Sequence, residues 1–125
     1  MLTRLLFSLF FLATMSPILG QSIAREWNEE VLNAVRNDFA RPTVHARNLF
    51  HTSVAMYDIW TVFDDRSEAF FLGKQWGNYI NDFRGFETTE TKEAAIDEAI
   101  SYAVYRLILH RFSEAPGYSD IQLAV

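Results

Sequence analysis

Apolar residues recur at intervals of three and four in three stretches of this chain, and this helical period most constrains its fold. In the first stretch, residues 23–39, Trp27, Val31 and Val35 share one face and charged residues fill the other. Pro42 follows, and proline disfavours helical geometry in the residue before it. The pattern predicts an amphipathic helix over residues 23–39.

The second stretch predicts a helix over residues 44–63, with Pro42 at its leading edge, where proline is well tolerated. Its apolar residues cover more than half of the helix circumference. We therefore expect this helix to be buried on several sides. The connection before it is short, so the first two helices should be antiparallel neighbours.

The third stretch predicts a helix over residues 92–112, preceded by threonines that can cap its N-terminus. Its apolar residues form one main face, which four aliphatic residues widen. The main face comprises Ala95, Ala99, Tyr102, Ala103, Leu107 and Phe112, and the widening residues are Ile96, Ile100, Val104 and Ile108. The chain is therefore predicted to be all-α, with about three amphipathic helices that form part of a larger helical bundle.

Residues 64–91 follow no helical period, and their glycines mark turns among many aromatic side chains. A structureless loop of this length is unusual inside a compact domain. We expect an ordered aromatic loop that covers a core or a site, with a short extended piece at residues 69–72.

Residues 1–20 have the pattern of a signal peptide. Arg4 precedes an apolar run that is shorter than the roughly 20 residues of a membrane-spanning helix, and Pro17 and Gly20 then suit cleavage before Gln21. We expect residues 21–125 to be exported, to the periplasm or out of the cell, with no stable membrane span after cleavage. The alternative is an uncleaved N-terminal anchor.

Charge and composition exclude several classes of function. With 11 basic and 16 acidic residues the chain has a net charge of −5, which argues against a nucleic-acid partner because such partners need a positive surface. The chain contains no cysteine, which excludes disulfides, thiol catalysis and cysteine-ligated zinc.

His45 and His51 are the obvious metal candidates, but the sequence gives them no shared site. Six positions separate them, which places them about 240° apart around a helix. No paired metal motif is present either. We therefore expect no metal ligand and no cofactor within this chain.

Arg47, His51 and Asp58 interrupt the otherwise apolar second helix and fall within about 40° of one another around it. Polar groups in such a position need hydrogen-bond partners. An acid–base or anion site is one interpretation. The interpretation that we favour is a structural polar network, because buried polar groups usually serve only to satisfy each other.

Three ordered blocks of sequence resemble a known family. They are SIAREWNEEVLNAVRNDFARPTVHARNLFHTSVAMYDIW at residues 22–60, FLGK at 71–74 and AISYAVYRLILHRF at 99–112. Together they resemble the N-terminal helical region of exported bacterial vanadium-dependent haloperoxidases, which are similar in architecture to type 2 phosphatidic acid phosphatases. The resemblance covers residues 22–117.

The resemblance implies a chain without the chemistry of its family. Family members hold vanadate with Lys-x6-Arg-Pro, Pro-Ser-Gly-His and Ser-Arg-x5-His motifs. Here Ala34 stands where Arg41-Pro42 would require the lysine, and the other two motifs are absent. The resemblance thus implies an N-terminal segment at residues 21–125 whose partner is the remainder of the same polypeptide, whose catalytic half is absent, and which carries no catalytic, cofactor-binding or metal residue. Vanadate is implied for the intact protein only.

Three functions remain open from the sequence. The first is a scaffold segment of a secreted vanadium-dependent haloperoxidase-like protein, in which vanadate would activate peroxide for halide oxidation. The second is the same fold in a secreted acid phosphatase. The third is a small exported helical module that binds a partner without catalysis.

Overall fold

The computed structural model describes residues 22–125, which are mostly helical, in agreement with the predicted all-α class. The elements are α2 (Ile23–Arg36), α3 (Pro42–Thr61), β1 (Gln75–Trp76), β2 (Tyr79–Ile80), α4 (Lys92–Arg111) and α5 (Tyr118–Ala124). The expected signal peptide, residues 1–20, lies outside the described residues.

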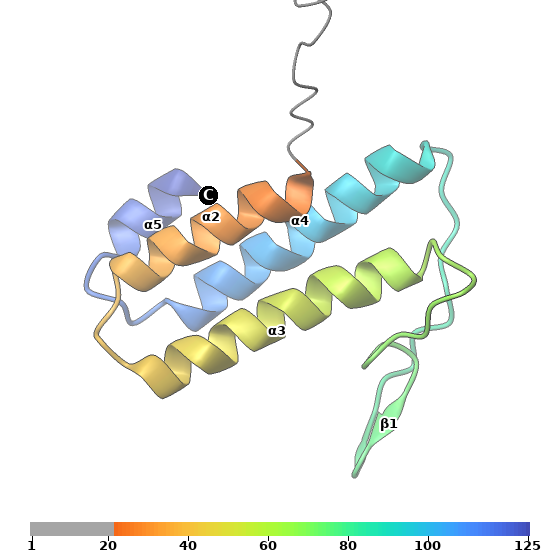
Figure 1. Ribbon diagram of the computed structural model, residues 1–125, viewed down its shortest axis with the longest axis horizontal. Helices are drawn as coiled ribbons and strands as arrows, with labels where there is room; N and C mark the ends of the chain where they lie inside the picture. The colour runs from red at the N-terminus through yellow and green to blue at the C-terminus, as the bar shows by residue number, and fades with distance from the viewer. Residues whose placement is uncertain (1–21) are drawn as a thin grey trace, which may run out of the picture.

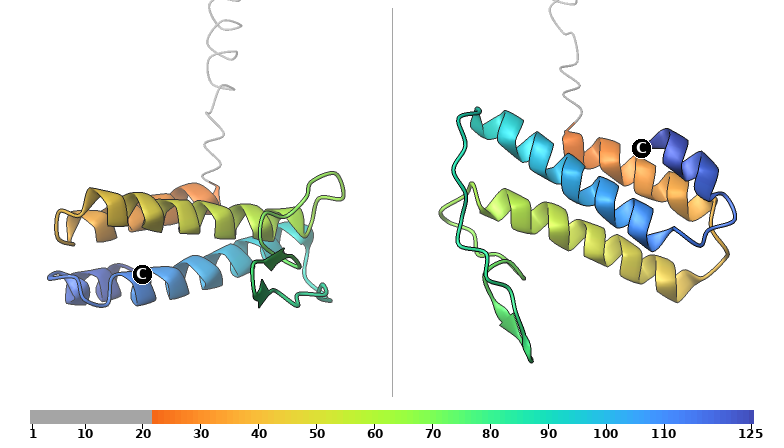
Figure 2. Two further views of the ribbon diagram at one scale, coloured as in Figure 1. Left: turned by 90° about the horizontal axis from the view of Figure 1, so that it is seen from below. Right: turned by 180° about the vertical axis from the view of Figure 1, so that it is seen from behind.

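The four described helices form two layers. α2 and α3 lie in one layer and α4 and α5 in the other, as the view from below shows in Figure 2. α3 packs mainly against α4, and α2 packs against α4 and α5 (Figure 1). α2 and α3 run antiparallel, as predicted from their short connection.

The hydrophobic core lies between α2, α4 and α5, and α3 contributes little to it. Its buried residues are Val31, Ala34, Met56, Ile100, Val104, Ile108, Phe112, Ala115 and Ile121. Of these, only Met56 comes from α3. The core side chains of α4 are mainly the aliphatic residues that the sequence pattern treats as widening its face, whereas Tyr102 of the predicted main face is 64% exposed.

Side-chain hydrogen bonds cap the starts of α2 and α4 and the end of α2. The hydroxyls of Ser22 and Thr91 accept hydrogen bonds from backbone N–H groups in the first turns of α2 and α4. α2 ends three residues before the predicted boundary, where the side chain of Asn37 donates to the carbonyl oxygen of Asn33. α3 starts at Pro42, two residues early, because the first turn of a helix does not need the N–H that proline lacks.

The short helix α5 is absent from the sequence prediction, because seven residues are too few to show a period. Gly117 precedes it and lies against the end of α2, where its backbone N–H donates to the carbonyl oxygen of Asn37 at 3.0 Å. A Cβ on Gly117 would lie 2.7 Å from the Cβ of Asn37. This close approach requires glycine.

The loop between α3 and α4 contains a small antiparallel hairpin, in which Trp76 pairs with Tyr79 around a turn at Gly77. Gly77 has φ +58°, a conformation that glycine adopts without strain. The extended strand piece predicted at residues 69–72 does not form, since three of its backbone N–H groups bind the carboxylate of Asp58 rather than another strand.

The expectation that α3 is buried on several sides is not met among residues 22–125. Its buried positions are mostly polar: Asn48, Thr52, Met56, Asp58 and Thr61. Its exposed positions include Leu49, Phe50, Tyr57 and Trp60, at 37–53%. The reason is geometric, because α4 and a small part of α2 cover only one side of the helix.

None of the described helices combines the length and the hydrophobicity that crossing a membrane would require.

Candidate functional site

A groove of about 580 Å³ lies between α3, α4 and the loop that carries the hairpin. Its volume falls within the range of about 300–1,000 Å³ that is typical of small-molecule sites. Aromatic and aliphatic side chains form most of its walls, and a few polar groups lie among them. The main apolar residues are Phe50, Val54, Ile59, Phe70, Trp76 and Leu107, and the polar or charged residues are His51, Asp58, Asn81 and Arg111.

Asp58 holds one wall of this groove in place. Its side chain is buried, and its carboxylate accepts hydrogen bonds from the backbone N–H groups of Phe70, Phe71 and Leu72 at 2.6, 2.8 and 2.9 Å. Charge-assisted bonds of this kind are stronger than bonds between neutral groups. Asp58 thus fixes the loop to α3.

The aromatic rings of this wall pack on one another and on α3. Phe70 stacks on Trp76 with ring centroids 5.0 Å apart and meets Phe50 edge-on at 5.9 Å. The indole N–H of Trp76 donates to the carbonyl oxygen of Phe70 at 3.2 Å. The hairpin is thereby tied to the segment that Asp58 orders.

A hydrogen bond between α3 and α4 supplies the polar end of the groove. The Nη2 atom of Arg111 lies 2.6 Å from Nδ1 of His51. Arginine can only donate, so Nδ1 accepts and the proton of the neutral imidazole is assigned to Nε2. Burial lowers the pKa of His51 below its usual value of 6.5, and the positive charges of Arg111 and Arg47 lower it further.

Arg111 also has a buried donor without a partner in the described part of the chain. Its Nε–H is buried and has no hydrogen-bond partner among residues 22–125. A buried donor without an acceptor costs about 1–3 kcal/mol. This atom is closed to solvent, so a ligand in the groove meets Arg111 through its other guanidinium N–H groups.

The three polar residues singled out in the sequence do not hydrogen-bond to one another within the described part of the chain. Asp58 binds the loop, His51 binds Arg111, and Arg47 is exposed. His51 and Asp58 nevertheless line the same groove. Arg47 acts on His51 only through its charge.

Sequence reasoning missed Arg111 and Trp76 as groove residues. In the sequence Arg111 is a basic residue in the last turn of a helix, where the helix dipole alone explains its charge, and its pairing with His51 spans 60 residues. Trp76 lay in a segment without periodicity. Only the chemistry of an unexplained histidine in α3 hinted that a partner existed.

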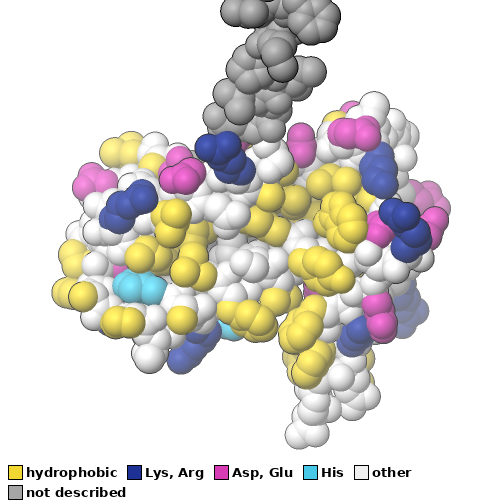
Figure 3. Space-filling view, viewed as in Figure 1, with side chains coloured by type: hydrophobic (Ala, Val, Ile, Leu, Met, Phe, Trp, Pro, Cys, Tyr) yellow, Lys and Arg dark blue, Asp and Glu magenta, His cyan; other side chains and the backbone are white. Residues whose placement is uncertain are grey.

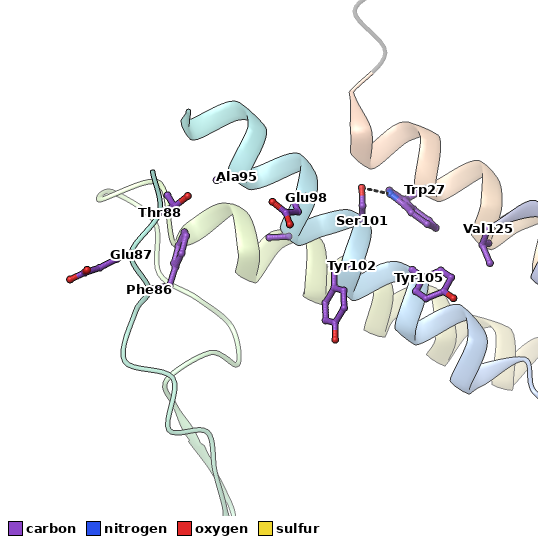
Figure 4. A pocket seen from close by; sticks show the side chains of 11 residues that line it. Trp27, Phe86, Glu87, Thr88, Ala95, Glu98, Ser101, Tyr102, Tyr105 and Val125 are labelled. Atoms are coloured by element: carbon purple, nitrogen blue, oxygen red, sulfur yellow. Dashed lines mark hydrogen bonds between the residues drawn. The ribbon is translucent and has the colours of Figure 1, made fainter. Parts of the chain in front are cut away.

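A second groove, of about 620 Å³, lies over α2, α4 and residues 86–88 (Figure 4). Tyr102 and Tyr105 project from α4 into it, and Trp27 of α2 donates its indole N–H to the hydroxyl of Ser101 at 2.9 Å. Its charged lining residues are Glu87 and Glu98. Large exposed aromatic rings thus occupy both sides of α4.

His45 and His51 have different surroundings. The Nε2 atom of His45 lies 2.8 Å from the carbonyl oxygen of Phe39, and its ring stacks on Phe112 at 6.5 Å. Across residues 22–125, no group of three or more histidine, cysteine, aspartate or glutamate side chains is arranged to hold a metal ion.

Comparison of the chain with protein families, with curated proteins and with solved structures found no match in any of the three.

Proposed function

We propose that this chain is a helical scaffold segment of a secreted vanadium-dependent haloperoxidase-like protein, and that it packs against further helices of the same polypeptide. The scaffold part of the proposal rests on the surface of the helices. The family part rests on the three ordered sequence blocks at residues 22–60, 71–74 and 99–112.

The observation that carries the scaffold role is the inverted polarity of α3. Four large apolar side chains, Leu49, Phe50, Tyr57 and Trp60, are exposed, while the buried residues of the helix are mostly polar. Figure 3 shows hydrophobic side chains gathered on the face of the molecule that is viewed there. Exposed apolar patches of this kind are typical of interaction surfaces.

The second face of α4 supports the same role. Tyr102 and Tyr105 are 64% and 39% exposed beside Trp27 and Phe86. Aromatic residues contribute strongly to helix–helix and protein–protein interfaces because each buries a large area. A helix with large apolar residues on both sides suits the interior of a larger bundle.

The described residues do not fit vanadate. An oxyanion of that kind needs several cationic and backbone donors that converge on it. The groove brings a single guanidinium, that of Arg111, against His51, and Asp58 already occupies the N–H groups of Phe70, Phe71 and Leu72. We therefore assign no chemical step to this segment.

The family assignment can be tested on the gene. The coding sequence that follows the codon for Val125 should continue in frame and encode the lysine–arginine, Pro-Ser-Gly-His and arginine–histidine motifs. The protein expressed from that longer frame should oxidise bromide in the presence of peroxide and vanadate. Hydrolysis of phosphoesters without bromide oxidation would instead indicate the acid phosphatase. A reading frame that lacks the motifs would exclude both the haloperoxidase and the phosphatase assignments.

The scaffold role can be tested separately by measuring stability in two contexts. Tyr57→Ser and Trp60→Ser should each lower the free energy of unfolding of the longer protein by about 1.5–3 kcal/mol, the cost of losing a buried large apolar side chain. The same changes in the 125-residue chain should cost much less, because these side chains are exposed there. Leu123→Ser, at 87% exposure, is the control. Equal effects in both contexts would contradict the proposal.

A further inference from the structure

The groove between α3 and α4 has apolar walls, and a positive charge that no acidic side chain of its lining neutralises lies at one end. Phe50, Val54, Phe70, Trp76 and Leu107 line the walls. At the polar end, Arg111 is the one lysine or arginine among the lining residues. A ligand that matches this lining needs an apolar body and a negative head.

No acidic side chain that lines the groove pairs with Arg111. Asp58 is the one carboxylate that lines the groove, and three backbone N–H groups already bind it. Arg111 makes its hydrogen bond to a neutral histidine nitrogen rather than to an acid. Its positive charge is therefore available to a ligand.

The donors at this end suit one carboxylate. Arg111 makes one side-chain hydrogen bond among the described residues, through Nη2, so its guanidinium keeps further N–H donors, and His51 retains an Nε2–H because Nδ1 accepts from Arg111. A guanidinium N–H and an imidazole N–H can together bind the two oxygens of a single carboxylate. The single charge of a carboxylate also matches the single cation of the groove, whereas a phosphate monoester carries more charge than Arg111 offsets.

We propose that this groove binds an amphipathic monocarboxylate, with its carboxylate at Arg111 and His51 and its aromatic or alkyl body against Phe50, Phe70 and Trp76. Charge complementarity selects the acid over a neutral or cationic compound of the same shape. The stacked rings of Phe70 and Trp76 offer flat apolar surface to the body of the ligand. This binding role goes beyond the scaffold role and shares with it only Phe50 of the four exposed side chains of α3.

The proposal is tested by calorimetric titration of the 125-residue chain at pH 7 with three compounds of one shape: phenylbutyrate, phenylbutanol and phenylbutylamine. We expect phenylbutyrate to bind at least about tenfold more tightly than phenylbutanol, because charge-assisted hydrogen bonds contribute the difference. Phenylbutylamine should bind most weakly. Equal binding of all three would indicate a non-selective apolar surface, such as one that another helix covers, and would overturn the proposal.

Two variants locate the carboxylate. Arg111→Gln should lower the affinity for phenylbutyrate about tenfold and leave the affinity for phenylbutanol unchanged, because only the acid interacts with the positive charge. Arg106→Gln is the matched control, since Arg106 is an exposed arginine of the same helix that hydrogen-bonds to Tyr102 rather than lining the groove. Unchanged phenylbutyrate binding in Arg111→Gln would overturn the proposal.

A third variant keeps the test decisive if Arg111→Gln fails to fold. Phe50 lines the groove and is 53% exposed, so Phe50→Glu adds a negative charge there without entering the core. This variant should bind phenylbutyrate more weakly and phenylbutylamine more tightly than the unmodified chain does. The opposite order, or no binding of any compound to the unmodified chain, would contradict a carboxylate site. The gene and stability tests of the scaffold role are unaffected by either result.

Discussion

Arg111 donates a hydrogen bond from Nη2 to Nδ1 of His51 at 2.6 Å and joins the last turn of α4 to the middle of α3. This contact requires a neutral imidazole, because a protonated His51 would present a donor and a positive charge to a guanidinium. The pair therefore couples the contact between the two helices to pH.

The first prediction concerns the titration of His51. Its pKa in the folded chain should lie below the usual 6.5, because burial and the charges of Arg111 and Arg47 favour the neutral form. The folded state then binds fewer protons than the unfolded state. Folding stability should be greatest above about pH 6.5 and should fall as the pH decreases from there to the folded-state pKa of His51.

Proton NMR titration of the histidine ring signals measures this pKa directly. Replacing Arg111 with methionine removes one of the two cations and should raise the pKa of His51. His51→Gln should flatten the dependence of stability on pH between pH 5 and 7, and His110→Gln, an exposed histidine on α4, is the control. A His51 pKa at or above 6.5 in the folded chain would refute the assigned geometry.

The second prediction concerns Asp58 and the loop it orders. Asp58→Asn keeps one acceptor oxygen but turns an amide NH₂ toward backbone N–H donors, so it should lower the free energy of unfolding by about 1–3 kcal/mol. Urea unfolding measures the loss. Hydrogen exchange should show faster exchange at the amides of residues 70–72, which donate to Asp58.

Asp65→Asn is the control for this variant, because Asp65 is an exposed acid near the C-terminal end of α3 and makes none of these bonds. Unaltered exchange at residues 70–72 in Asp58→Asn would show that the loop is held by its aromatic contacts alone.

The third prediction concerns the close approach of Gly117 to Asn37. Gly117→Ala places a Cβ 2.7 Å from the Cβ of Asn37, so α5 must move away from the end of α2. The cost of such overpacking is about 1–3 kcal/mol, measured by thermal or urea unfolding. Ser119→Ala, at an exposed position two residues further on, should change stability by less than about 0.5 kcal/mol.

The fourth prediction concerns the bond between Trp27 and Ser101, which joins α2 to α4 at 2.9 Å. Ser101→Ala should lower the free energy of unfolding by about 1 kcal/mol, because it leaves the indole N–H without its acceptor. A double-mutant cycle with Trp27→Phe should show coupling, since the second change removes the donor that the first one left unpaired. Strict additivity would mean that the bond contributes nothing to stability.

The sequence determined the helical class and most helix positions, because periodicity and caps are local signals. Pro42 and the threonines before residue 92 mark helix starts through their own backbone and side-chain chemistry, and the structure confirms a helix after each. The helix α5 and the hairpin at residues 75–80 were not predicted, since each is too short for a period to emerge from the sequence.

Which side of each helix is buried could not be decided from periodicity alone. In α3 and α4 apolar residues surround most of the helix, so the pattern does not choose between faces. The packing of the helices decides which face is buried. In α4 it buries Ile100, Val104 and Ile108 in the core and leaves Tyr102 exposed.

By itself the sequence determined that three long helices lie between residues 23 and 111. It also singled out Arg47, His51 and Asp58 as polar residues that required an explanation. Only the tertiary structure decided what they do. It brought Arg111 to His51 across 60 residues, placed the loop amides on Asp58 and left Arg47 exposed. The physical reason is that a hydrogen-bond partner is chosen by distance in space, and no local pattern records which distant residue the packing of two helices will bring within reach.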